Sequence, residues 1–131
     1  MKYSTLFITQ CSFLVRQSYF TTDQTTPDVA ETRCVGEGGH LASIHDAVTN
    51  NYLLTLTGPT DWVHIGGLYV NGEWTWTDGS LWDYEAWAPG QPTPRPVDGD
   101  YVEFHNREWS KREVDNYHTH GYICQKIPTQ K

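Results

Sequence analysis

Two helical patterns lie in the first half of the chain. Thr26-Pro27-Asp28 has the features of a helix start: a hydroxyl N-cap, a proline at the first helical position and an acid beside the positive end of the helix dipole. The glycines of residues 36–39 are expected to end this helix. Ser43 is expected to cap a second helix that stops at Gly58-Pro59. Helical spacing predicts its inward face, which is Ile44, Ala47, Val48 and Tyr52.

Strand patterns surround these helices. The run from Trp62 to Leu68 predicts a buried strand, and Tyr101–His105 alternates as a strand does before a turn at Asn106-Arg107. Residues 120–125 predict the strand that closes the sheet. At the start of the chain, Lys2–Thr9 and Ser12–Phe20 predict one or two further strands.

The most unusual stretch runs from Gly72 to Pro92 and holds four of the six tryptophans. Trp74 and Trp76 have the period-two spacing that puts two indoles on one face of a strand. A turn signal follows at residues 77–80, and beyond it there is no long apolar period, only rings, prolines and glycines. This composition predicts a long ordered loop that is anchored by its indole rings, and such loops are usually functional.

These motifs resemble the long-loop region of C-type lectin-like domains. The likeness continues at residues 38–45, 63–68 and 121–125, in the family's order and spacing. It implies an α+β fold of two helices, antiparallel sheets and a long Trp/Pro/Gly-rich loop region. We expect one domain over residues 1–131, with an N-terminal strand segment (1–20), a core (21–125) and a short tail (126–131).

Length and charge narrow the class of protein. A chain of 131 residues is long enough for one hydrophobic core. The net charge of −7, without any run of Lys or Arg, argues against nucleic-acid binding. No apolar run reaches the roughly 20 residues of a membrane span. The first fifteen residues look in part like a signal peptide, but polar residues break the apolar run and no cleavage site follows, so we expect the segment to be retained.

The resemblance pairs Cys34 with Cys124 in a disulfide between the first helix and the last strand. This bond would close a loop of about 90 residues, worth up to roughly 4–5 kcal/mol in the chain-entropy model. Cys11 is left over, either as a buried thiol or as an intermolecular bridge that would make a homodimer. A disulfide implies an oxidising compartment, so we expect a secreted or extracellular protein.

In calcium-dependent members of the family, oxygen ligands around a cis proline hold the ion and the sugar. The resemblance therefore assigns calcium as a cofactor held by Gln91, Asp98, Asp100 and Glu113. The predicted ligand-binding residues lie on the same loop and are Gln91, Thr93, Asp98, Asp100, Trp82 and Arg95.

The sequence also departs from the calcium-binding pattern. Aligned on Trp109, Ser110 and Lys111 stand where the family has Asn and Asp, and an ammonium group repels calcium. Counted back from Cys124, Arg112 and Glu113 stand there instead. The first alignment, which we prefer, keeps a core tryptophan in place, and it also puts Tyr101 at the first cysteine of the family's missing inner disulfide.

Other polar residues give weaker signals. His118 and His120 are spaced to share a strand face, as in some zinc sites, but no third ligand is placed, so a structural role is favoured. His64 stands where the family usually has Trp and is expected to be a hydrogen-bonded core residue. Glu103, with His105 and Glu108, could mimic an acid–base pair, but no motif of an enzyme is present and we predict that the protein is not one.

The expected function is that of an extracellular recognition module. Carbohydrate is the ligand that the resemblance implies, bound at the loop face around Gln91–Asp100. The alternative is a calcium-independent protein-binding domain, and fold analogy alone does not choose between a glycan and a protein partner.

Overall fold

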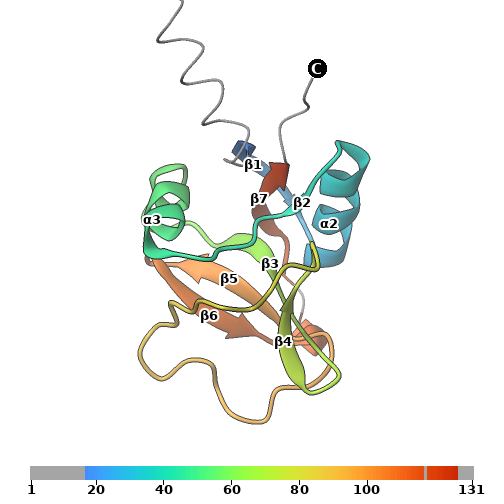
Figure 1. Cartoon of the computed structure of the whole chain (residues 1–131), viewed down its shortest axis with the longest axis vertical. Coiled ribbons are helices and arrows are strands. Elements are labelled where there is room, and N and C mark those ends of the chain that lie inside the picture. Colours follow the sequence, from blue (N-terminus) through green and yellow to red (C-terminus); the bar gives the residue numbers. More distant parts are fainter. Residues whose placement is uncertain (1–16, 117, 127–131) are drawn as a thin grey trace, which may run out of the picture.

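The computed structural model describes residues 17–116 and 118–126, which form two α-helices, seven strands and one 3-10 turn (Figure 1). The helices are α2 (Pro27–Gly36) and α3 (Ala47–Thr55), and the 3-10 turn is η1 (Val114–Asn116). The strands are β1 (Gln17–Thr25), β2 (His40–Leu41), β3 (Val63–Val70), β4 (Glu73–Trp76), β5 (Tyr101–His105), β6 (Glu108–Arg112) and β7 (His120–Lys126). The expected strand Lys2–Thr9, the start of Ser12–Phe20 and Cys11 lie outside the described residues.

The strands are connected in one sheet with the order β1-β7-β3-β5-β6, to which β2 is added beside β7 and β4 beside β3. Every pairing is antiparallel except that of β3 with β7, where Val63 lies opposite Gly121 and His64 opposite Tyr122. The α+β prediction is confirmed, with the difference that this parallel contact joins the expected antiparallel sheets into one mixed sheet. The described start and end of the chain lie side by side, since Gln17 pairs with Lys126.

The first helix follows its prediction and the second does not. α2 begins at Pro27 and buries Ala30 and Cys34, as expected. The Thr26 hydroxyl does not cap the helix backbone as predicted, because it donates to the Asp28 carboxylate at 2.6 Å instead. α3 begins later than expected because its N-cap is Asp46, whose carboxylate accepts the Thr49 N–H at 2.7 Å. The hydrogen bonds from Thr49 hold the pKa of Asp46 below its usual value.

The inward face of α3 also differs from the expected one. The buried residues are Asn50, Leu53 and Leu54, whereas Val48 and Tyr52 are exposed. Ile44 is buried, but it lies in the non-helical chain before α3. A helical period counted from Ile44 is therefore out of phase with the buried face of α3. Within the described ranges, neither helix is both long and apolar enough to cross a membrane.

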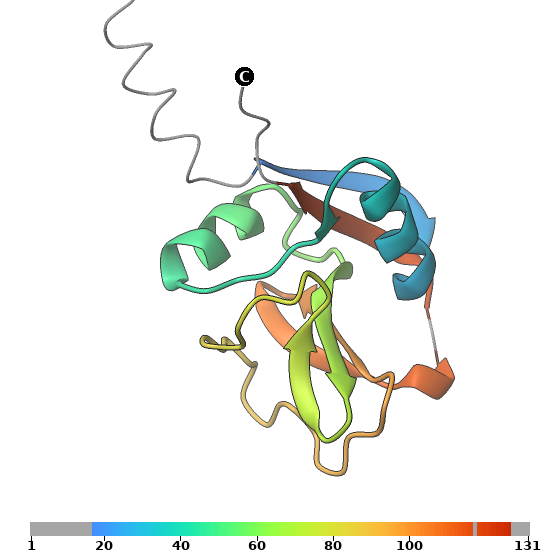
Figure 2. The same cartoon turned by 45° about the vertical axis from the view of Figure 1, so that its right-hand side comes forward.

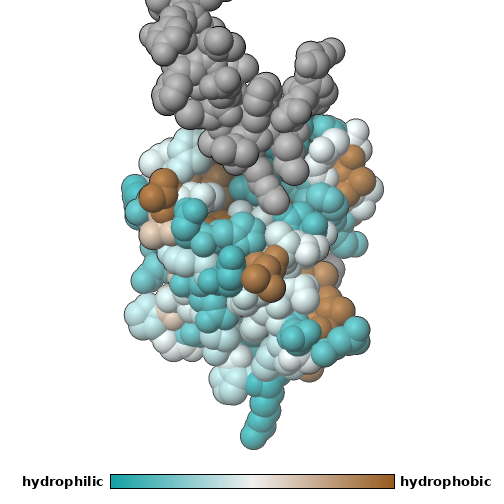
Figure 3. Space-filling model, viewed as in Figure 1, coloured by the Kyte–Doolittle hydropathy of each residue, from teal (hydrophilic) through white to brown (hydrophobic). Residues whose placement is uncertain are grey.

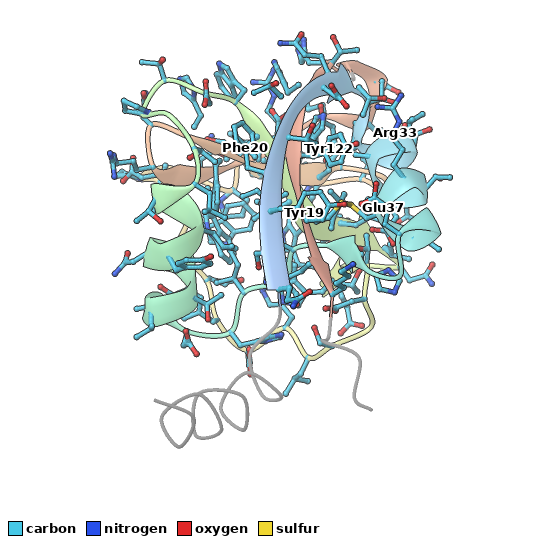
Figure 4. All side chains as sticks on the ribbon, turned by 90° about the horizontal axis from the view of Figure 1, so that it is seen from above. Tyr19, Phe20, Arg33, Glu37 and Tyr122 are labelled. Carbon is cyan, nitrogen blue, oxygen red and sulfur yellow. A yellow bond between two sulfur atoms is a disulfide. The ribbon has the colours of Figure 1, made fainter. Side chains whose placement is uncertain are left out.

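The predicted disulfide is present, with the Cα atoms of Cys34 and Cys124 5.4 Å apart. Around it a small buried cluster joins α2 to the sheet and consists of Ala30, Leu41 and Tyr122, with Tyr19 at its edge. Figure 4 shows Tyr19 and Phe20 on opposite sides of β1. Tyr19 packs on this cluster, while Phe20 packs on the main core under α3.

The main core continues into a cluster of indoles that holds the long loop. This indole cluster is Trp74, Trp76, Trp82, Trp87 and Trp109. Trp82 stacks on Trp76 with ring centroids 4.4 Å apart, and fully buried Trp109 donates its Nε1–H to Asn50 on α3 at 2.9 Å. The loop therefore gains order from ring packing, as the sequence predicted.

We expect Gly66→Ala to destabilise the fold. A Cβ at Gly66 would lie 2.8 and 2.9 Å from the carbonyl oxygens of Leu41 and Ala42, which are backbone atoms that cannot move away cheaply. Overpacking of this kind typically costs about 1–3 kcal/mol. Chemical denaturation measures the loss of unfolding free energy.

Gly36→Ala is the matched control. A Cβ at Gly36 meets nothing within 4 Å, and Gly36 lies at the end of α2, so this change is expected to be neutral or to stabilise by up to about 1 kcal/mol. Equal effects of the two substitutions would contradict the close approach of β3 to residues 41–42.

Candidate functional site

The predicted binding residues lie on the loop between β4 and β5. Figures 1 and 2 show the later part of this loop, which leads into β5, at the end of the molecule away from α2 and α3. Its first part, after β4, runs beside the segment before α3, where Ser43 donates to Asp78 at 2.6 Å. The peptide bond between Gln91 and Pro92 is cis, as at the corresponding place in the family. On the face seen in Figure 3, apolar side chains form separate spots in a largely polar or neutral surface.

A buried ion pair occupies the centre of the predicted site. The Lys111 ammonium lies 3.6 Å from Asp100 Oδ2, and both side chains are only 2% exposed. The Asp100 carboxylate also accepts backbone N–H groups from Val97 at 3.0 Å and from Val114 at 3.0 Å. Asp100 therefore fixes the end of the loop and the segment after β6 around a cation that the chain itself supplies.

Three more of the predicted residues lie around Lys111. The side-chain oxygen of Gln91 accepts the Lys111 backbone N–H at 2.9 Å, which ties the cis-proline segment to β6. Thr93 and Glu113 line, together with Lys111 and Arg112, a hollow of about 230 Å³. Glu113 and Thr93 are exposed at its rim, and Lys111 forms its base.

The remaining predicted residues do not converge on that hollow. Asp98 accepts the Asn71 N–H at 2.9 Å and so caps the turn between β3 and β4. Arg95 is exposed in the proline-rich part of the loop and has a positive φ of 60°. Trp82 belongs to the indole cluster, and its Nε1–H donates to Glu85 at 2.7 Å.

This donor set does not fit calcium. Calcium takes six to eight oxygens at about 2.3–2.6 Å. Here both Asp100 oxygens and the Gln91 oxygen already accept hydrogen bonds, and the nearest cation is the Lys111 ammonium. A divalent ion at this place would be repelled at close range by the Lys111 ammonium in a region of low dielectric. The structure also agrees with the alignment on Trp109, because Lys111 points into the site while Glu113 stays at the surface.

Tyr101 stands in for the inner disulfide. Its ring is buried, and its hydroxyl accepts the backbone N–H of His118 at 3.4 Å, in the loop where the second cysteine would lie. A hydrogen bond thus holds this loop near the sheet. Burial and the neighbouring Glu103 carboxylate raise the pKa of Tyr101, so the hydroxyl stays protonated near neutral pH.

A second polar centre, which the sequence did not predict as a unit, lies inside the sheet. Glu103 is fully buried, and its Oε2 lies 2.7 Å from His64 Nδ1 and 2.8 Å from His120 Nδ1. Burial raises the pKa of Glu103, but the contacts and charges of His64 and His120 outweigh it and leave the pKa below its ordinary value. We call His64, Glu103 and His120 the His–Glu cluster.

The sequence drew attention to His64, Glu103 and His120 one by one, but did not predict that they meet in one cluster. His64 was expected to be hydrogen-bonded in the core, and its Nε2 does bond the Thr25 carbonyl at 2.7 Å. His105 stacks on Trp62 with centroids 3.5 Å apart. Among the described residues, no hydrogen bond joins His105 to Glu103 or Glu108, so the acid–base pair considered from the sequence is not assembled.

These features define a domain with a long loop, held by indole rings, on a mixed sheet. The chain belongs to the C-type lectin family: the family description "Lectin C-type domain" matches residues 23–126. Recognition from the sequence is confirmed.

Several known proteins are similar to this chain. It is 42% identical over 67 residues to a type-2 ice-structuring protein of Brachyopsis segaliensis, covering 51% of this chain and 40% of that protein. It is 39% identical over 69 residues to the galactose-specific lectin nattectin of Thalassophryne nattereri, covering 48% and 43%. A crystal structure of a calcium-independent type II antifreeze protein superposes with a TM-score of 0.76 at 33% identity and 86% coverage of both chains. The matches thus span less than half the length of these curated relatives.

We expect Lys111→Met to destabilise the protein strongly. The change leaves the buried Asp100 carboxylate without its counter-charge, and breaking such a pair from one side costs about 3–5 kcal/mol. The free energy of unfolding from denaturant titration measures the loss. The double variant Lys111→Met/Asp100→Asn should recover part of it, because neither buried charge then remains.

Arg33→Met is the control for loss of a cation. Arg33 is exposed on α2, so its replacement is expected to change stability by no more than about 0.5 kcal/mol. A Lys111→Met variant as stable as this control would show that the pair with Asp100 is not a buried one.

Proposed function

We propose that this chain is a calcium-independent recognition domain that binds a protein ligand through the loop face around Gln91–Asp100, outside the cell. The observation that carries the proposal is the buried Lys111–Asp100 pair. It provides, within the chain, the positive charge that calcium provides in the calcium-dependent members of the family. The loop is then ordered without any ion from solution.

The surface of the loop supports a protein partner. Arg95 is exposed, and two large apolar side chains of the same loop, Leu81 and Val97, are 76% and 54% exposed. Arginine is a frequent anchor of protein interfaces, and exposed apolar side chains add area that can be buried against a partner. The prolines between residues 91 and 97 stiffen the loop, which lowers the entropy lost on binding.

Carbohydrate remains the other ligand class. In the family, vicinal hydroxyls of the sugar complete the coordination of calcium, and this route requires the ion. The relative nattectin is a galactose-specific lectin by its name. A sugar bound by this chain would have to contact Gln91, Thr93 and Glu113 directly, and Gln91 has already committed its oxygen to Lys111. This geometry favours the protein ligand. The disulfide between Cys34 and Cys124 supports an extracellular location.

The first test is the response to calcium. We expect the melting temperature to be unchanged by millimolar Ca²⁺ and by chelator, since a ligand stabilises only a native state that binds it. Retention on galactose and mannose resins should be equally low with and without calcium. Lys111→Asp is the matched variant: it replaces the ammonium by a carboxylate beside Asp100 and is expected to introduce a melting shift with Ca²⁺.

A reversible calcium-induced rise in the melting temperature of the unaltered chain would overturn the proposal. For the ligand class, a panel of purified extracellular proteins and a glycan array can be probed side by side in chelator. The double variant Arg95→Ala/Val97→Ser should lose protein binding, while Glu37→Gln, exposed on the far side at the end of α2, should retain it. Glycan binding that survives in chelator, without protein binding, would select the carbohydrate ligand.

Ice is a second candidate ligand, because one of the sequence relatives is an ice-structuring protein and a similar solved structure is a calcium-independent antifreeze protein. A protein that binds ice lowers the freezing point below the melting point. We expect such a gap, measured by nanolitre osmometry, to persist in chelator if ice is the ligand. Reduced and unfolded chain is the control. Freezing at the melting point would remove this candidate.

A further inference from the structure

We propose that the His–Glu cluster of His64, Glu103 and His120 is a binding site for a divalent transition-metal ion, for which Zn²⁺ is the best fit. One ligand atom from each residue lies within 4.8 Å of the other two. The inference is independent of the calcium question, since these residues lie on β3, β5 and β7 and the predicted calcium ligands lie on and beside the long loop.

The hydrogen bonding of His64 fixes which of its nitrogens is available. Its Nε2 lies 2.7 Å from the Thr25 carbonyl, which can only accept, so Nε2 carries the proton. In the neutral ring Nδ1 then carries a lone pair, and it lies 2.7 Å from Oε2 of Glu103. Two lone pairs at this distance repel each other, and a metal ion bound by both would remove that repulsion.

Burial makes an unsatisfied nitrogen costly at this place. His64 and Glu103 are both 0% exposed, and His64 Nδ1 has no aligned hydrogen bond. Buried polar atoms are almost always satisfied, so this nitrogen calls for an explanation. Nδ1 lies 2.7 Å from Glu103 Oε2 without hydrogen-bond alignment, which is the geometry of two ligands that face a common centre.

The surroundings of the cluster match those of metal ligands in proteins. A ligating histidine usually donates its other N–H to a carbonyl or carboxylate, and His64 donates to Thr25. A ligating carboxylate is usually held by a further donor, and Arg112 Nε lies 3.4 Å from Glu103 Oε1. Arg112 is itself held over the Trp62 ring, 4.5 Å from its centroid. Oε2 is thus left to face the two imidazoles.

Two imidazoles and one carboxylate form a borderline donor set that suits zinc and disfavours calcium. Tetrahedral ligands about 2.0–2.1 Å from zinc lie roughly 3.4 Å from one another, so Oε2 and the two Nδ1 atoms need to separate by less than about 1 Å. The fourth position would be open to water. Access is through His120, whose side chain is 21% exposed.

The proposed site differs from the pair of His118 and His120 that the sequence suggested, because it does not include His118. Its ring stacks beside that of His120, with centroids 5.7 Å apart, but it is not one of the three ligands. His118 and His120 therefore provide a matched pair of substitutions: neighbouring rings of the same kind, one inside the cluster and one outside it.

The test uses the full chain, stripped of metal with chelator and dialysed, and titrated with ZnCl₂ by calorimetry and with CoCl₂ by visible absorption. We expect one ion per chain, with the intense absorption of four-coordinate cobalt and a rise in melting temperature on zinc binding. His120→Asn should weaken zinc binding by at least about tenfold, since even outer-sphere partners of a metal contribute about 10–100-fold. His118→Asn should leave the affinity within about twofold.

Three results would overturn the proposal: no saturable binding of one ion, unchanged affinity in His120→Asn, or an equal loss in His118→Asn. His120 is partly exposed, so its variant is expected to fold, and circular dichroism of both variants verifies this before titration. Calcium chloride added at the same concentration is expected to displace no zinc, and displacement would likewise count against a nitrogen-rich site.

Discussion

The packing of Trp109 is the contact on which the rest of this structure depends. Its ring is fully buried between α3 and the long loop, where it donates to Asn50 and meets Trp76, Trp82 and Trp87. Its backbone pairs with the loop as well, because Ala88 N–H donates to the Trp109 carbonyl and Trp109 N–H to that of Ala86. An irregular segment has few internal hydrogen bonds, so this combination of rings and backbone bonds supplies the order that regular structure would otherwise give.

Two buried ionic groups accompany this packing, one just before β5 and one at its middle. Asp100 pairs with Lys111 at the loop, and Glu103 meets His64, His120 and Arg112 inside the sheet. A buried carboxylate needs a cation close by, because its desolvation is otherwise uncompensated. At the loop the cation is a side chain that cannot leave, which supports ligand binding without calcium. Inside the sheet two of the partners are imidazoles, whose ring nitrogens can bind a metal ion.

The Lys111–Asp100 pair and the His–Glu cluster have different proposed roles in this fold. The proline-rich part of the loop exposes Arg95 and Val97 on a scaffold that is ordered, in our proposal, without a dissolved ion. The sheet interior carries the residues suited to a metal, on β3, β5 and β7. Arg112 lies between the two places, because it contacts Glu103 and also lines the hollow beside the loop.

The first helix and the anchoring of the loop by indoles followed from local properties of the sequence, which are turns, helix signals and ring spacing. The fold and the Cys34–Cys124 bond followed from the resemblance to the family, whose motifs keep their order along the chain. It also showed that Lys111 stands where a calcium ligand is usual. The inward face predicted for α3 was wrong, because the period was counted from Ile44, which is buried in the non-helical chain before the helix.

Only the tertiary structure decided what the charged residues do. Lys111 pairs with Asp100 across 11 positions of chain, and His64, Glu103 and His120 meet because β3 lies between β5 and β7. A contact of this kind depends on strand order and register, and a shift of one residue would turn each side chain to the opposite face. Composition and spacing do not contain that information, so the meeting of these groups could be read only from the folded chain.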